Sequence, residues 1–150
     1  MAQGTGGSLR RRQSLVLPGL NEALCEAVRA FTRSAVNRDE RNAQRAHFLQ
    51  VCKQTGKTPE ELGFALPEEA VPDVPENGEY LWAWFQELSS GRGNNGFGVL
   101  PLSWADMDAW ARLTGNQPEP WETAILRSMD GAFLAVWHEE TGRKLSESRK

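Results

Sequence analysis

All six tryptophans of this 150-residue chain lie in its second half. Large aromatic side chains can build the core of a small domain, or they can leave an apolar surface that another polypeptide covers. The tryptophan-rich stretch is therefore the expected centre of the fold, and the choice between these two uses is the main functional question. The residues are Trp82, Trp84, Trp104, Trp110, Trp121 and Trp137.

Length and composition favour a single domain without cross-links. A chain of this size can bury a core unaided, and Cys25 and Cys52 are too few and too far apart for a disulfide framework. We expect both to be reduced cysteines in a cytosolic protein. No stretch approaches the roughly 20 apolar residues of a membrane span, so we expect no membrane partner.

Charge is unevenly distributed along the chain. Residues 1–57 hold ten Lys and Arg against four Asp and Glu, whereas residues 58–150 hold seven against sixteen. Such asymmetry can mark a basic arm for nucleic acid, but it equally fits solvated helix faces or a docking surface for a protein. We favour the last two, with a nucleic-acid-binding or packaging adaptor as the alternative.

Apolar residues at helical spacing, separated by prolines and glycines, predict an all-α domain of about four or five helices. Pro67, Pro72 and Pro75 interrupt the pattern in an acidic stretch that cannot continue a helix. The expected organisation has five parts: a disordered basic tail (1–18), a basic N-terminal helical part (19–66), a Pro-rich acidic connector (67–78), a Trp-rich helical part (79–140) and a frayed tail (141–150).

Local signals place several helix ends. The first amphipathic helix is expected to begin near Leu20. A second, over residues 40–54, is expected to turn one side inward, made of Ala43, Ala46, Leu49 and Val51 or Cys52. Thr58-Pro59-Glu60-Glu61 predicts the start of a helix of at most two turns. Farther on, Ser103 with Asp106 forms a capping-box pattern, Gly115 is a stop signal, and Pro120 suits the first position of the last helix.

The last helix, expected over about residues 120–139, carries two apolar stripes. One contains Trp121, Ala124, Ile125, Ser128, Met129, Ala132 and Val136, and the other contains Leu126, Phe133 and Trp137. Together they span an arc too wide for a helix packed on one side only. The helix is therefore either enclosed in the core or offers a docking face.

Motifs for catalysis, cofactors and metals fail on their context. The run from Gly91 to Gly98 contains the spacing G-x-G-x-x-G, but a helix rather than a strand is expected before it, and Pro101 follows soon after. His138-Glu139 resembles the start of a zinc-protease motif, but Gly142 stands where the second histidine would fall. We therefore expect no catalytic, cofactor-binding or metal-binding residues, and no enzyme activity.

Several short runs together are similar to one protein family. They are 54–59 (QTGKTP), 80–85 (YLWAWF), 108–115 (DAWARLTG), 120–122 (PWE) and Leu126-x-x-Met129-Asp130. Over about residues 41–140 the chain resembles the tail assembly chaperones of bacteriophages and prophages, although Met129 stands where leucine would be expected. These are packing and turn residues rather than reactive ones.

The resemblance implies a non-catalytic role in building long phage tails. Its partners would be the apolar helical tape-measure protein, which the chaperone keeps soluble, and tail-tube subunits, recruited through an extended frameshift product where one exists. It also implies action in the bacterial host cytoplasm, assembly as a homo-oligomer and absence from the mature virion. A structural protein that stays in the virion is an alternative.

A chaperone for a long helix needs apolar side chains on its surface. Four residues lie off the main apolar faces of their expected helices, and we predict that they bind the partner: Trp82, Leu126, Phe133 and Trp137. The alternative for each of them is ordinary core packing.

Overall fold

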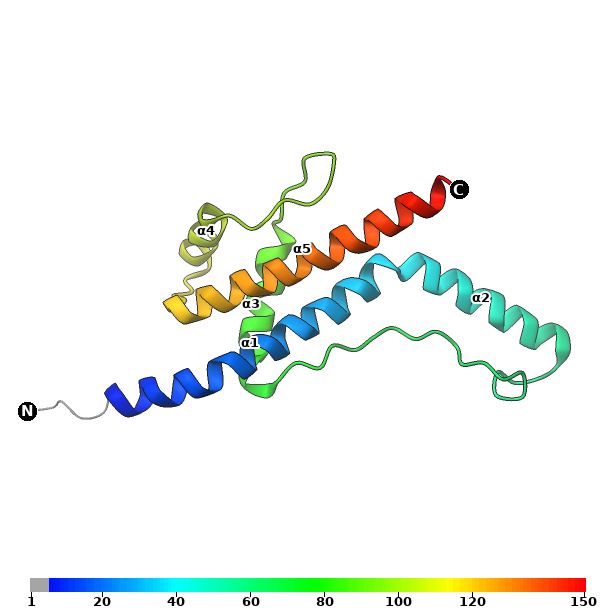
Figure 1. Ribbon diagram of the computed structural model, residues 1–150, viewed down its shortest axis with the longest axis horizontal. Coiled ribbons are helices and arrows are strands. Elements are labelled where there is room, and N and C mark those ends of the chain that lie inside the picture. Colours follow the sequence, from blue (N-terminus) through cyan, green and yellow to red (C-terminus); the bar gives the residue numbers. More distant parts are fainter. Residues whose placement is uncertain (1–5) are drawn as a thin grey trace, which may run out of the picture.

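Two long helices, α1 (Gly6–Val36) and α5 (Pro120–Ser148), lie side by side and run in the same direction in the computed structural model (Figure 1). The structure describes the backbone of residues 6–150 and the side chains from Gly19 onward. The short helix α3 (Glu79–Ser90) packs across this pair, and α4 (Trp104–Thr114) lies near the start of α5. Over the described residues all regular elements are helical, which confirms the predicted all-α fold.

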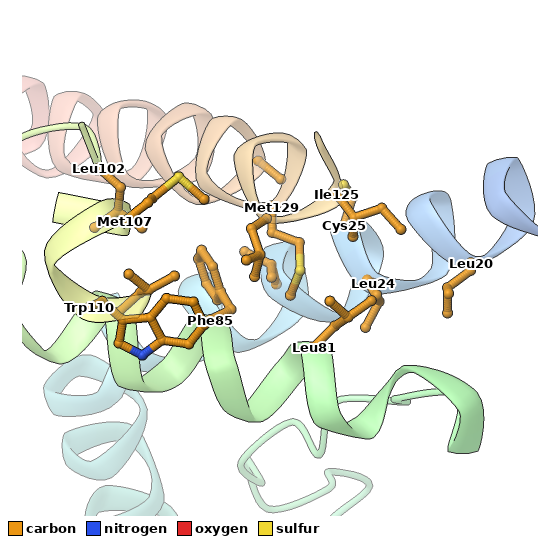
Figure 2. Close-up of a cluster of buried hydrophobic side chains, with 14 residues drawn as sticks. Leu20, Leu24, Cys25, Leu81, Phe85, Leu102, Met107, Trp110, Ile125 and Met129 are labelled. Atoms are coloured by element: carbon orange, nitrogen blue, oxygen red, sulfur yellow. The ribbon is translucent and has the colours of Figure 1, made fainter. Parts of the chain in front are cut away.

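The core forms where α3 meets α1 and α5. Leu24 of α1, Leu81 of α3, and Leu126 and Met129 of α5 are fully enclosed. Figure 2 shows core side chains from α1, α3 and α5 packed together, with Met107 and Trp110 of α4 at one end of the cluster. Burying one such aliphatic side chain contributes about 1.5–3 kcal/mol. The core therefore joins the basic N-terminal part of the chain to the tryptophan-rich part.

Local capping chemistry sets the ends of α4 and the start of α5 as predicted. The Ser103 hydroxyl accepts a hydrogen bond from the Asp106 backbone N–H, and the Asp106 carboxylate accepts one from the Ser103 N–H. Gly115 ends α4 with φ of 74°, a left-handed conformation that favours glycine. Pro120 begins α5, where its missing N–H costs no intrahelical bond.

Both long helices extend beyond their predicted limits. α1 starts at Gly6, so the backbone of residues 6–18 is helical where the sequence predicted a disordered tail. Extending an existing helix costs much less than starting one, and α1 is already held by its packing from Leu20 onward. α5 continues to Ser148, which corrects the frayed tail expected at 141–150.

The end of α5 is ordered by contacts with the bend between α1 and α2 (Arg38–Thr55). The buried Glu140 carboxylate accepts hydrogen bonds from Asn37 Nδ2 at 3.0 Å and from Arg33 Nε at 3.2 Å. Arg143 donates to Asn37 Oδ1, and Lys144 Nζ donates to the Val36 carbonyl oxygen. The Asn37 amide contributes most to lowering the pKa of Glu140, and the two arginines assist.

The helix α2 has no buried residue, so the inward face predicted for it is wrong. Ala43, Ala46 and Leu49 are exposed, and Val51 and Cys52 are only half-buried. Helical periodicity shows an amphipathic face but not whether another element covers it. Instead α2 meets the connector on another face, where the rings of Phe48 and Phe64 stack with centroids 4.4 Å apart.

The segment after α2 is a turn rather than the predicted short helix. The capping-box hydrogen bonds of Thr58 and Glu61 form, but Gly63, with φ of 76°, ends the turn at once. An extended connector then returns beside α1 and reaches α3 through the single turn η1 (Glu76–Gly78), as the proline-rich stretch predicted (Figure 1).

Candidate partner-binding surface

The structure separates the four predicted partner-binding residues. Leu126 is fully enclosed in the core and cannot reach a partner without unfolding. Trp82, on α3, is half-buried and packs edge-on against Phe31 of α1, with the ring centroids 5.7 Å apart. Phe31 is itself 37% exposed, so the two rings form an apolar shelf at the surface where α3 crosses α1.

Phe133 and Trp137 form a second apolar area on α5. Both are half-buried, and their rings stack with centroids 6.1 Å apart. The guanidinium of Arg92 lies 4.2 Å from the centre of the Phe133 ring, a favourable cation–π contact. A Cβ at Gly98 would lie 4.0 Å from Trp137 Nε1, so the loop between α3 and α4 runs along this stripe.

A buried ion pair fastens that loop to α5. Arg92 Nη1 lies 2.6 Å from Asp130 Oδ1, and both side chains are less than a tenth exposed. The other carboxylate oxygen of Asp130 accepts a hydrogen bond from the Leu102 N–H at 3.1 Å, while Arg92 donates to the Leu100 carbonyl oxygen. The pair therefore holds both ends of the loop.

Sequence reasoning missed this pair, although one signal was present. Asp130 follows Leu126 by four residues and precedes Phe133 by three, so it stands within the second apolar stripe of α5. A charged residue in such a stripe requires a buried partner. Nothing local identified that partner as Arg92, in a loop 38 positions earlier.

Further apolar side chains reach solvent around α4 and the loop. Phe97, near the loop tip, is 99% exposed, Leu113 is 86% exposed and Trp104 is 61% exposed. The guanidinium of Arg127 lies 4.3 Å from the centre of a Trp104 ring. These large apolar side chains are accessible to another polypeptide on the surfaces of α4 and of the loop.

Few groups on the described part of the chain have the properties of a metal ligand or a nucleophile. Within residues 19–150 no three His, Cys, Asp or Glu side chains are grouped to hold a metal ion. Burial raises the pKa of the Cys25 thiol. Burial, followed by a hydrogen bond to Glu122, likewise raises the pKa of Tyr80. In the same part of the chain, no helix is long and apolar enough to cross a membrane.

Comparison with known families decides what kind of protein presents these surfaces. A family model described as phage tail assembly chaperone matches residues 51–135, more than half of the chain. The chain belongs to the phage tail assembly chaperone family. This confirms the family resemblance found in the sequence. No curated protein and no solved structure matches the chain.

The chaperone family match covers much of the candidate surface. It includes α3, α4, the intervening loop and the first half of α5, and therefore Trp82, Trp104 and Phe133. Trp137 lies two positions beyond it, and α1, with Phe31, lies before it. Family membership therefore assigns the chain to tail assembly, while the surface features extend to both sides of the match.

Proposed function

We propose that this protein binds the tape-measure protein during tail morphogenesis, keeps it soluble and helps recruit tail-tube subunits. The observation that carries the proposal is the match to the phage tail assembly chaperone family over residues 51–135. The role needs no catalytic step. It requires a surface on which apolar helical segments can rest until the tail tube covers them.

The exposed and half-buried aromatic rings support this function. Trp82, with Phe31, and the stacked pair Phe133 and Trp137 are the contact residues that we assign to the tape measure. Rigid aromatic rings supply a large contact area at a small cost in conformational entropy. Leu126 is omitted because it belongs to the core.

The remaining parts of the proposal follow from the same assembly role. The protein acts as a homo-oligomer in the bacterial host cytoplasm and leaves before the virion matures. Recruitment of the tail-tube protein proceeds through an extended frameshift product where the phage makes one. Recovery of the chain in stoichiometric amount from purified virions would instead support the structural alternative.

Co-expression with the tape-measure protein of the same phage or prophage tests the proposal. The soluble yield of the tape measure is compared without this chain, with it, and with the variants Trp82→Gln, Phe133→Gln and Trp137→Gln. The matched control is Leu49→Gln, since Leu49 is exposed on α2 and lies outside the candidate contact surfaces.

We expect the wild-type chain and the control to rescue solubility and to co-purify with the tape measure. The aromatic variants should retain their helical circular dichroism and lose much of the rescue. A tape measure that stays insoluble and forms no complex with the wild-type chain contradicts the proposed function.

A further inference from the structure

A groove lies between α1 and the extended connector, apart from the aromatic stripe of α5. Its volume is about 300 Å³, and it is lined by Ala23, Glu26, Ala27 and Ala30 of α1 and by Val71 and Asp73 of the connector. In Figure 1 the connector runs beside α1 over this stretch. The groove therefore lies between two segments far apart in the sequence.

The connector is fastened at both ends of the groove. At one end the Ser34 hydroxyl accepts hydrogen bonds from the Ala70 N–H at 3.3 Å and from Arg41 Nη1 at 2.9 Å. At the other end Val74 packs against the core. The intervening segment is thus held in place, and the space beside it is part of the folded structure.

The floor of the groove suits close packing of a helix. Ala23, Ala27 and Ala30 recur at i, i+4 and i+7, so they share one side of α1 and leave it low. A second helix can approach such a surface and seat its larger side chains on it. A volume of about 300 Å³ admits anchor side chains, whereas a whole helix, about 10–12 Å across, must lie above them.

The groove continues into an apolar surface already assigned to the partner. Phe31 follows Ala27 by one helical turn and packs on Trp82, so the aromatic shelf borders the alanine floor. On the connector side, Val71 is 89% exposed and is available to an apolar ligand. From Ala23 to Phe31 the combined surface extends over more than two turns of α1, so it can contact more than two turns of a second helix lying along it.

Charge at the rim selects the occupant. Glu26 and Asp73 are the two ionisable residues of the lining, and both are acidic. Arg29 pairs with Glu26, whereas Asp73 makes no ion pair among the residues that the structure describes. A cationic side chain in the occupant would complement Asp73, and an acidic one would be repelled.

We propose that this groove binds an amphipathic helix of the tape-measure protein. Its apolar residues rest on the alanine floor and the Phe31–Trp82 shelf, and a lysine or arginine beside them pairs with Asp73. The inference rests on the proposed function and deepens it, because it assigns one kind of tape-measure segment, an amphipathic helix with a neighbouring cation, to one place on the chaperone.

Peptide binding to the full chain tests the groove. Overlapping fluorescent peptides of about eight helical turns, covering the tape-measure protein of the same phage, are titrated by anisotropy against four proteins. They are the wild type, Ala30→Phe, which fills the groove, Asp73→Lys, which reverses its rim charge, and Asp108→Lys, a control that reverses an exposed carboxylate on α4.

The peptides that bind should carry apolar residues at helical spacing with a neighbouring lysine or arginine. Ala30→Phe should weaken them about tenfold or more, and Asp73→Lys about fivefold or more. Asp108→Lys should leave affinity within about twofold. Changing the peptide's cation to glutamate should restore binding to Asp73→Lys, which loss of folding cannot explain. If Ala30→Phe unfolds, Val71→Asp tests the same surface from the exposed connector.

Three outcomes overturn the inference in distinguishable ways. Equal binding by all variants, with solubility rescue intact, removes the groove and leaves the proposed function standing. Absence of both peptide binding and rescue by the wild type removes the function itself. A dimer in sedimentation that Ala30→Phe converts to monomer, with peptide binding unchanged, assigns the groove to a second copy of the chain.

Discussion

Replacing Asp130 with alanine should destabilise the fold more than any surface substitution. The change removes the carboxylate that faces Arg92 and accepts the Leu102 N–H, and both charged side chains are less than a tenth exposed. In the variant the Arg92 guanidinium would remain in the interior without its counter-ion. The loop between α3 and α4 would lose its attachment to Asp130 at both of its ends.

The expected size follows from the cost of a lone buried charge. Breaking a buried ion pair on one side typically costs about 3–5 kcal/mol. Arg92 keeps its contact with the Phe133 ring and its hydrogen bond to the Leu100 carbonyl oxygen, so we expect about 3 kcal/mol. That is a large share of the roughly 5–15 kcal/mol that stabilises an ordinary domain.

Urea unfolding followed by tryptophan fluorescence measures this loss. The matched variants are Asp130→Asn, which keeps an acceptor for the Leu102 N–H and should lose less, and the double variant Arg92→Met with Asp130→Leu. The double variant should recover most of the stability, because replacing both members of a buried pair by apolar residues is often neutral or favourable. A loss below about 1 kcal/mol for Asp130→Ala would refute the reasoning, since the pair would then be solvated.

Other predictions test separate parts of the fold. Ser103→Ala should cost about 1 kcal/mol in the same urea assay, because it removes the N-cap acceptor of α4. The Asn37 amide and nearby arginines lower the pKa of Glu140. The ionised carboxylate therefore stabilises the fold above the unfolded-state pKa of about 4.3, and this stabilisation is lost as pH falls through the lower pKa of the folded state. Glu140→Gln should flatten that part of a curve of unfolding free energy against pH. Burial raises the pKa of Cys25, so a thiol reagent at pH 8 should label the half-buried Cys52 first, and Cys52→Ser should abolish the rapid phase; equal rates would show that Cys25 is not enclosed.

The features that could be predicted from sequence are those set within one or two helical turns. Ser103 with Asp106, Gly115 and Pro120 each act on their immediate neighbours, and the structure places helix ends at all of them. The order of helices and the extended connector follow in the same way, since a proline stops a helix whatever surrounds it.

Features that depend on distant partners could not be predicted. Leu49 is as apolar as any core residue, but no helix covers its side of α2. α5 continues past residue 140 because Arg143 and Lys144 contact a bend more than 100 positions earlier. Leu126 was assigned to a partner because the helical pattern of α5 could not show that α1 and α3 enclose it from two sides.

The position of α1 couples folding to the proposed binding surface. The family match begins at Val51, yet α1, which precedes it, supplies Leu24 and other residues to the core against the enclosed face of α5. A neighbouring side of the same helix, on which Ala27 is itself buried, forms the alanine floor of the groove. A substitution that shifts α1 against α5 therefore also disturbs the groove, because the connector is attached to α1 at Ser34 and to the core at Val74. Core packing and the proposed binding thus use neighbouring sides of one helix. The binding affinity of a groove variant can therefore be interpreted only together with its free energy of unfolding.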